Sequence, residues 1–350
     1  MGRKADIAKY QAFVKDALIC SGFSEEDSER VSELMILNEK LGISTHGSFH
    51  LITYIKKMQE GLLDPKGEIE VVKEGPTWAV IDAHKNLGFV ASYKAMDLAI
   101  KKAKEYGMAY VTVTHSSHYG TGAAYELMAS KAGMASIVFS NTWKLMAVPG
   151  TKVPVIGNSP IGYGLPDTEG HPSVFMDIAT SAASLTKCMR YQEAGEDCPP
   201  GWIVDEDGRP TTDVSKPFSL MPAAAHKGYG AAFMIEALTA FVAGGGRVGQ
   251  NWMGEPGVEP DVSHGFIVID IDQITGGKVF GERLDEYIDE IHSAPKAVGA
   301  DKIYVPGEIE QDNLKAADES GVIELMDVHI ARMQKVAEMY GLDLEKCFVE

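Results

Sequence analysis

The chain has 350 residues, 45% of them hydrophobic, and a formal net charge of −18. This composition can fill a large core, and the length favours two domains over one. Because an acidic surface repels phosphodiester backbones and anionic membranes, we expect neither nucleic acid nor a membrane as partner. The four cysteines form no CxxC pair and no apolar signal segment opens the chain, so we expect a cytoplasmic protein with reduced thiols.

The first part of the chain predicts helices. Apolar residues recur at helical spacing over 7–20. Ser24 followed by Asp27 resembles a capping box, which predicts a helix running to Leu41. A short loop over 42–47 then leads into a third helix, for which Gly61 is a suitable end.

From about residue 69 the pattern changes to alternating strands and helices, which favours an α/β fold. Strands are expected in the ranges 69–82 (two, around Gly75-Pro76), 108–114, 134–140, 153–165 and 174–178. Helices are expected in the ranges 91–106, 121–132 and 181–194.

The last part begins with a polar connector over 201–213, followed by a long apolar helix over 227–243 that we expect to be buried on most sides. A strand over 265–271 and helices over 283–292, 308–320 and 324–340 complete the chain. Helical ends and a mixed middle predict a discontinuous helical domain, 1–75 plus 300–350, on a central α/β domain, 76–299.

Two histidine-bearing loops are the first places where chemistry is expected. His46 lies at a helix start and titrates near neutral pH, so it is suited to proton transfer, with Ser44 or Thr45 to orient it. A surface cap with an uninvolved histidine is the alternative. The second loop contains His115 and His118, which could also be metal ligands, although no carboxylate stands nearby at a defined spacing.

Glycines and helix starts mark candidate anion sites. Gly120-x-Gly122 begins like a dinucleotide fingerprint, but Tyr125 stands at the third glycine position, so a Rossmann motif is not supported. Lys227 opens an apolar helix, where a cation is unfavourable unless it binds an anion such as a cofactor phosphate. The strand end over 176–181 is a second candidate, since α/β proteins place ligands there.

The order of these motifs resembles the type-2 malate/L-lactate dehydrogenase family, which includes ureidoglycolate dehydrogenase, diketogulonate reductase and sulfolactate dehydrogenase. The motifs are Thr-His-Gly at 45–47, His-Tyr-Gly at 118–120, Gly-Asn-Ser-Pro at 157–160, Asp-Ile-Ala-Thr-Ser at 177–181, His-Lys-Gly-Tyr-Gly at 226–230 and Pro-Gly-Glu at 306–308. The resemblance covers nearly the whole chain.

This resemblance implies a non-Rossmann, NAD- or NADP-dependent oxidoreductase that transfers a hydride to or from a small 2-hydroxy or 2-oxo acid. It also implies a homodimer with its active site in the cleft between the domains. Expected catalytic residues are His46, His118 and Lys187. Expected substrate-binding residues are Ser44, Thr45, His50 and Asn158. Expected cofactor-binding residues are Gly120, Thr121, Gly122, Ser140, Asn141, Asp177, Ile178, Ala179, Thr180, Ser181, His226, Lys227, Gly307 and Glu308. No metal is expected.

The sequence departs from the family pattern at His50, where many members carry an arginine expected to hold the substrate carboxylate. An arginine binds a carboxylate in bidentate fashion with a permanent charge, so we expect a substrate that is smaller, bound differently, or not a simple malate-like dianion. A cyclic-imine carboxylate reductase, a metal-dependent hydrolase using His115 and His118, and a non-catalytic binding protein are the alternatives. The choice between NAD and NADP, the substrate and the direction stay open.

Overall fold

The computed structural model describes residues 2–248 and 261–349. At its centre is a seven-stranded mixed sheet in the order β2-β3-β4-β11-β5-β6-β7, in which only β3 and β4 run parallel. Its strands are β2 (Glu70–Gly75), β3 (Trp78–Asp82), β4 (Met108–Ser116), β5 (Met134–Ser140), β6 (Ile161–Gly164), β7 (Phe175–Ile178) and β11 (Val262–Asp270). The apolar β11 lies between β4 and β5, which explains its nearly continuous burial.

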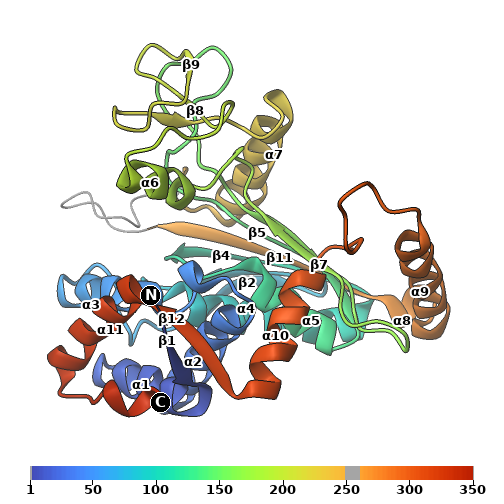
Figure 1. Ribbon diagram of the computed structural model, residues 1–350. Helices are drawn as coiled ribbons and strands as arrows, with labels where there is room; N and C mark the ends of the chain where they lie inside the picture. The colour runs from blue at the N-terminus through green and yellow to red at the C-terminus, as the bar shows by residue number, and fades with distance from the viewer. Residues whose placement is uncertain (1, 249–260, 350) are drawn as a thin grey trace.

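Helices cover the two faces of this sheet (Figure 1). The helices α4 (Gly88–Tyr106) and α5 (Gly122–Lys131) pack on one face, and α7 (His226–Glu236) with the π-helical segment η3 (Ala237–Phe241) packs on the other. A small lobe lies next to α7 and consists of α6 (Leu185–Ala194), β8 (Ile203–Val204), β9 (Pro210–Thr211) and β10 (Ser219–Leu220). At the far end of the sheet lie α8 (Ile271–Ile274) and α9 (Gly277–Ser293).

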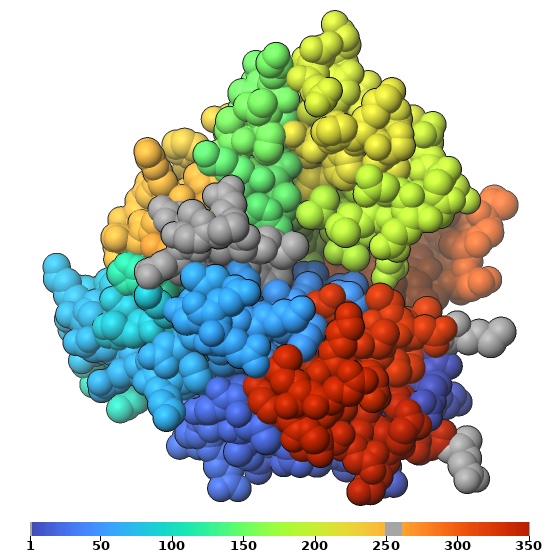
Figure 2. Space-filling view, turned by 90° about the vertical axis from the view of Figure 1, so that its left-hand side faces the viewer, coloured from blue at the N-terminus to red at the C-terminus, as the bar shows by residue number. Residues whose placement is uncertain are grey.

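The two ends of the chain lie side by side, as the adjacent blue and red surfaces of Figure 2 show. The N-terminal elements are β1 (Gly2–Asp6), α1 (Ile7–Cys20), α2 (Glu25–Lys40) and α3 (Leu51–Gln59), and the C-terminal ones are α10 (Glu308–Ser320), β12 (Val322–Met326), α11 (Asp327–Tyr340) and η4 (Glu345–Cys347). Strand β1 pairs with β12, while α11 contacts α1 and α3, and α10 contacts α2. In the described ranges, no helix is long and apolar enough to cross a membrane.

Most predicted elements are confirmed, including the Ser24 cap, whose side chain accepts a hydrogen bond from the Asp27 amide. One prediction is wrong: the helix over 227–243 is not buried on most sides, because Phe233, Met234 and Phe241 are each more than half exposed. The strand predicted over 153–165 is formed only at Ile161–Gly164.

Three further differences concern unpredicted short strands and the start of one helix. The helix predicted over 324–340 is preceded by β12, which pairs with the unpredicted β1. The connector over 201–213 contains β8 and β9, and α6 begins at Leu185 after a Ser184 cap.

Candidate active site

Three histidines predicted from separate motifs meet at one place. His46 and His50 end the 3-10 turns η1 (Ser44–His46) and η2 (Ser48–His50), just before α3, and His118 lies on the loop between β4 and α5. The ring centroid of His118 is 5.6 Å from that of His46 and 5.6 Å from that of His50. The cluster therefore joins the N-terminal helices to the central sheet.

Hydrogen bonds fix His46 within this cluster. Its Nδ1 lies 2.9 Å from Thr45 Oγ1, which can accept the Nδ1 proton and leave the Nε2 lone pair available. Asn38 on α2 donates from Nδ2 to the His46 carbonyl oxygen (3.0 Å) and accepts at Oδ1 from Thr121 Oγ1 (2.6 Å). Asn38 thus connects the two histidine loops, a role that the sequence analysis missed.

The hydrogen bonds to His118 indicate which ring nitrogen carries the proton. The Gly120 amide donates to His118 Nδ1 (3.4 Å), so Nδ1 is an acceptor, and the hydroxyl of Tyr54, 2.7 Å away, donates to the same atom. The proton of the neutral ring is therefore on Nε2. Tyr54 lies one helical turn after His50 on α3, and the sequence analysis did not identify it.

Burial keeps the cluster uncharged. It lowers the pKa of His46 to about 4, and it lowers the pKa of His118 well below its usual value. Burial, with the charges of His46 and Arg332, lowers the pKa of His50 to about 3. At neutral pH the site thus offers an imidazole that can accept a proton, His46, beside one that donates a hydrogen bond, His118.

A fourth histidine, which no sequence motif identified, packs against the loop that carries His118. His264 on β11 is fully buried and stacks on Tyr119 with ring centroids 4.7 Å apart. Its Nε2 donates to the Ser117 carbonyl oxygen (3.1 Å), and its Nδ1 lies 2.9 Å from Ser140 Oγ. The only signal in the sequence was a polar residue within an apolar strand.

The segments predicted to bind the cofactor converge on β7. Asp177 Oδ2 accepts from the amide of Gly122 (2.7 Å) at the start of α5, and burial raises the pKa of Asp177 to about 6. At the start of α7, Gly228 is so close to Thr180 that a Cβ would lie 2.4 Å from the Thr180 carbonyl oxygen. Gly307, with φ +86°, lies against Phe175 in the same strand.

Comparison with known proteins identifies the family. Residues 5–334 match the family described as malate/L-lactate dehydrogenase. The chain belongs to this family.

Two archaeal relatives of this dehydrogenase match it over most of their length. Malate dehydrogenase of Pyrococcus horikoshii is 33% identical over 309 residues, covering 85% of this chain and 84% of the relative. L-sulfolactate dehydrogenase of Methanocaldococcus jannaschii is 33% identical over 335 residues, covering 94% and 95%. The solved structure of that sulfolactate dehydrogenase matches with a TM-score of 0.91 over 100% of both chains. The protein is therefore an oxidoreductase of the malate/lactate dehydrogenase type, which acts on 2-hydroxy acids.

A more distant structural neighbour is named for a different substrate. The delta1-piperideine-2-carboxylate reductase of Pseudomonas syringae matches with a TM-score of 0.84 and 25% identity, over 96% of this chain and 100% of its own. The fold of the dehydrogenase thus also occurs in an enzyme named as a reductase of delta1-piperideine-2-carboxylate.

Other predicted residues lie outside the histidine cluster. Lys187 is exposed on α6. Asn158 accepts from Thr142 Oγ1 at its side chain (3.1 Å) and from the Thr180 amide at its carbonyl (3.2 Å), so it lies beside the cofactor segments. Asn141 is buried and bonds the Ser263 amide (2.8 Å), which indicates a structural role. The remaining predicted positions form parts of the segments already described: Ser44, Ile178, Ala179, Ser181, His226 and Glu308.

His115 and His118 do not act together. His115 Nδ1 lies 2.9 Å from Asp82 Oδ2 where β3 and β4 end, whereas His118 faces Tyr54. Within residues 2–248 and 261–349, no group of three His, Cys, Asp or Glu is arranged to hold a metal ion.

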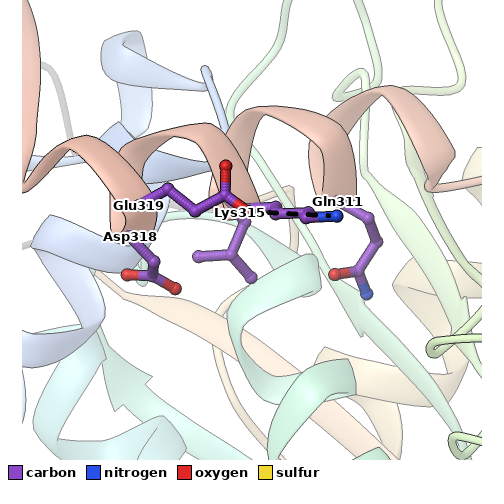
Figure 3. Close-up of a pocket in the computed structure, with 5 residues that line it drawn as sticks. Gln311, Lys315, Asp318 and Glu319 are labelled. Atoms are coloured by element: carbon purple, nitrogen blue, oxygen red, sulfur yellow. Dashed lines mark ion pairs between the residues drawn. The ribbon is translucent and has the colours of Figure 1, made fainter.

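A shallow hollow of about 400 Å³ lies on the surface of α10 (Figure 3). Its lining residues belong to that one helix: Gln311, Leu314, Lys315, Asp318 and Glu319. It contains none of the predicted site residues, so we do not place the chemistry there.

Proposed function

We propose that this dehydrogenase transfers a hydride between the nicotinamide of NAD or NADP and C2 of a small 2-hydroxy or 2-oxo acid. The observation that supports this proposal most directly is the pair of neutral imidazoles, His46 and His118, with ring centroids 5.6 Å apart. Removing a hydride from an alcohol carbon requires a base for the hydroxyl proton and a donor to the oxygen, and the pair provides both.

In oxidation, His46 Nε2 accepts the proton of the substrate hydroxyl, and in reduction it returns that proton to the oxygen. The Nε2–H of His118 donates a hydrogen bond to the same oxygen. The nicotinamide, when bound, supplies the hydride acceptor or donor. Thr45 holds the ring of His46 and Asn38 holds its backbone carbonyl, so little reorganisation accompanies proton transfer.

The residues around β7 fit a dinucleotide. Within the described ranges, Thr180 Oγ1 is buried without a hydrogen-bond partner, which leaves it available to a ligand. The adjacent start of α7 carries Lys227, and helix starts favour phosphate groups. Ala224 and Ala225 have φ of 47° and 54°, a strained conformation that is often found at ligand sites. We propose that Thr180, Lys227 and the Gly307-Glu308 turn hold the cofactor.

We further propose a non-Rossmann enzyme with a helical domain on a central domain, acting as a cytoplasmic homodimer. The predicted division was 1–75 plus 300–350 and 76–299; because β2 pairs with β3 in the central sheet, we move the first boundary from 75 to 69. The mainly antiparallel sheet supports a non-Rossmann fold. The pairing of β1 with β12 supports a helical domain built from both ends of the chain. Large apolar side chains exposed on α7 and η3 support a dimer contact. They are Phe233 and Met234 on α7, Leu238 and Phe241 on η3, and Val242 directly after η3. Phe241→Glu should shift the sedimenting species towards the monomer.

The decisive test combines a substrate panel with a histidine variant. Pyruvate, oxaloacetate, 2-oxoglutarate, sulfopyruvate and a cyclic imine carboxylate are assayed with NADH and with NADPH, at the nicotinamide absorbance. His46→Asn should lower kcat about 100-fold or more and leave NADH binding, measured by fluorescence, unchanged. His84→Asn, at an exposed histidine, is the matched control. An unchanged kcat in His46→Asn refutes the assigned role, and turnover of the imine alone favours the reductase alternative.

A further inference from the structure

His264 is a buried polar side chain in the middle of the central sheet. The strand that carries it, β11, lies between β4 and β5 (Figure 1). The residue is 0% exposed, and burial lowers its pKa to about 3, so the ring is neutral at physiological pH. A buried imidazole needs hydrogen-bond partners for its ring nitrogens, and those partners show what the residue holds in place.

One ring nitrogen of His264 binds the loop that follows β4. Its Nε2 donates to the Ser117 carbonyl oxygen (3.1 Å), and Ser116 Oγ lies 3.0 Å from the same nitrogen. Ser117 is the residue directly before His118. The hydrogen bond therefore fixes the peptide that leads into the proposed catalytic histidine.

The other ring nitrogen is bound by Ser140 at the end of β5, a residue that the sequence analysis assigned to the cofactor. Because Nε2 carries the proton of the neutral ring, Nδ1 of His264 is an acceptor. The Ser140 hydroxyl lies 2.9 Å from Nδ1, nearer than to the Asn141 carbonyl oxygen (3.0 Å) or the Ser263 carbonyl oxygen (3.4 Å). Ser140 is only 2% exposed. A directed chain of hydrogen bonds thus leads from Ser140 through the imidazole to the loop after β4.

The ring of His264 also holds the residue directly after His118. It stacks on the Tyr119 ring with centroids 4.7 Å apart and an interplanar angle of 9°. Tyr125 on α5 stacks on the same tyrosine (5.3 Å, 17°), and its hydroxyl donates to the Tyr119 carbonyl oxygen (2.6 Å). His118 is therefore the middle residue of a tripeptide whose two flanking residues are held by contacts from the sheet and from α5.

An apolar side chain would fill the position of His264 without the need for buried hydrogen bonds. Phe266 and Val268 follow two and four residues later, on the same side of β11, and both are 0% exposed. The hydrogen-bonding groups, and not the bulk, distinguish His264 from these neighbours. This difference indicates a role beyond packing.

We propose that His264 is a positioning residue that orients His118 for catalysis and that Ser140 supports it by binding Nδ1. The inference rests on the proposed function, since it takes His118 as the hydrogen-bond donor to the C2 oxygen. A donor stabilises developing charge best when its direction is fixed before the reaction begins. His264 acts through Ser117 and Tyr119, which carry His118 between them. Ser140 is thereby assigned to this support and not to the cofactor.

The first test measures the hydride-transfer step itself. NADH or NADPH oxidation by the acid preferred in the panel is followed by stopped flow in a single turnover, together with KM and the fluorescence titration of the cofactor. His264→Phe keeps a buried ring beside Tyr119 and removes both hydrogen bonds. It should slow hydride transfer about 10- to 100-fold and leave KM and cofactor affinity within about twofold of the wild type. His264→Gln, which keeps an amide donor for the Ser117 carbonyl, should recover part of the rate.

Two further variants serve as controls. Val268→Ala leaves a cavity in the same strand, where Val268 pairs with Ala109 and Ser136, and should transfer the hydride at the wild-type rate. A rate as low as that of His264→Phe would indicate general loosening of the sheet and overturn the proposal. Ser140→Ala should slow the step about threefold or more with unchanged cofactor affinity. Weaker cofactor binding at an unchanged rate would return Ser140 to the cofactor site and contradict its assignment here.

A double-mutant cycle with His118→Asn tests whether His264 acts through His118. His264→Phe should slow hydride transfer in the wild-type background and add little in His118→Asn, because the side chain that it orients is then absent. The same factor in both backgrounds would mean that His264 acts independently of His118, and the proposal would be overturned.

Hydrogen exchange separates this inference from the proposed function, because it requires no turnover. The Gly120 amide donates to His118 Nδ1 (3.4 Å), so its protection reports on the position of that ring. Amides of residues 118–122 should exchange faster in His264→Phe than in Val268→Ala, as measured by mass spectrometry. Faster exchange supports the positioning role even if no acid in the panel is reduced and the proposed function fails. Equal exchange in the two variants overturns the inference and leaves the proposed function standing.

Discussion

A carboxyl group beneath the histidine loop should make the enzyme less stable at alkaline pH. Glu39 on α2 is buried, and its Oε1 accepts hydrogen bonds from the Ser48 amide (3.0 Å) and hydroxyl (2.8 Å). Burial raises the pKa of Glu39 from 4.5 to about 8. Because the folded pKa exceeds the unfolded one, this group contributes stability that is complete below pH 4.5 and is lost as pH rises through 8.

The size of the effect follows from these values. At about 1.36 kcal/mol per pH unit, a rise in pKa from 4.5 to about 8 corresponds to a loss of roughly 5 kcal/mol of unfolding free energy, of which roughly 4 kcal/mol falls between pH 5 and pH 9. Glu39→Gln keeps the acceptor oxygen and cannot ionise. The stability of the variant relative to the wild type should therefore increase by a few kcal/mol over this range.

The assay is urea unfolding followed by circular dichroism at pH 5 and at pH 9. Glu33→Gln, at an exposed glutamate of the same helix that pairs with Arg30, is the control and should show a much smaller change. If the difference between Glu39→Gln and the wild type is the same at both pH values, Glu39 is not held in its neutral form and the reasoning is refuted.

Three further substitutions test the site. Tyr54→Phe removes the hydroxyl donor from His118 Nδ1, so kcat/KM should fall about 10-fold or more with the fold intact, and unaltered kinetics would contradict the assigned ring proton. Asn38→Ala removes both hydrogen bonds between the histidine loops, which should cost about 2 kcal/mol in urea unfolding and lower kcat; a loss of stability alone would limit Asn38 to a structural role. Gly307→Ala combines φ +86° with a Cβ 2.9 Å from Phe175, so it should destabilise the protein by about 1–3 kcal/mol and weaken NADH binding in a fluorescence titration, whereas wild-type affinity would exclude this turn from the cofactor site.

Elements whose signals are local were predictable from the sequence. The bounds of β5 and α10 agree with the predicted ranges. A run of mostly apolar residues marks β5, and Gly321 directly follows the last residue of α10. Strand β12 was not predictable in this way, since Val322–Met326 continues the helical periodicity of α11 and becomes a strand only by pairing with β1.

The sequence motifs pointed to the three clustered histidines, but not to their arrangement or to Asn38, Tyr54 and His264 around them. His46, His50 and His118 follow from their motifs, yet the Tyr54–His118 hydrogen bond joins positions 64 residues apart, which no local pattern encodes. The exposed apolar face of α7 and η3 was mistaken for core because apolar character alone does not distinguish a buried face from an exposed one.

The pairing of β1 with β12 has a consequence for how the enzyme matures during synthesis. His329 and Arg332, which support the histidine loop, lie on the helix that directly follows β12, and the Ser48–His329 contact spans 281 residues. A nascent chain on the ribosome therefore exposes the loop long before its support emerges, and contacts of such high sequence separation form late. Turnover should consequently begin only after release of the completed polypeptide, and a premature stop codon before α11 should yield a protein without a formed catalytic centre.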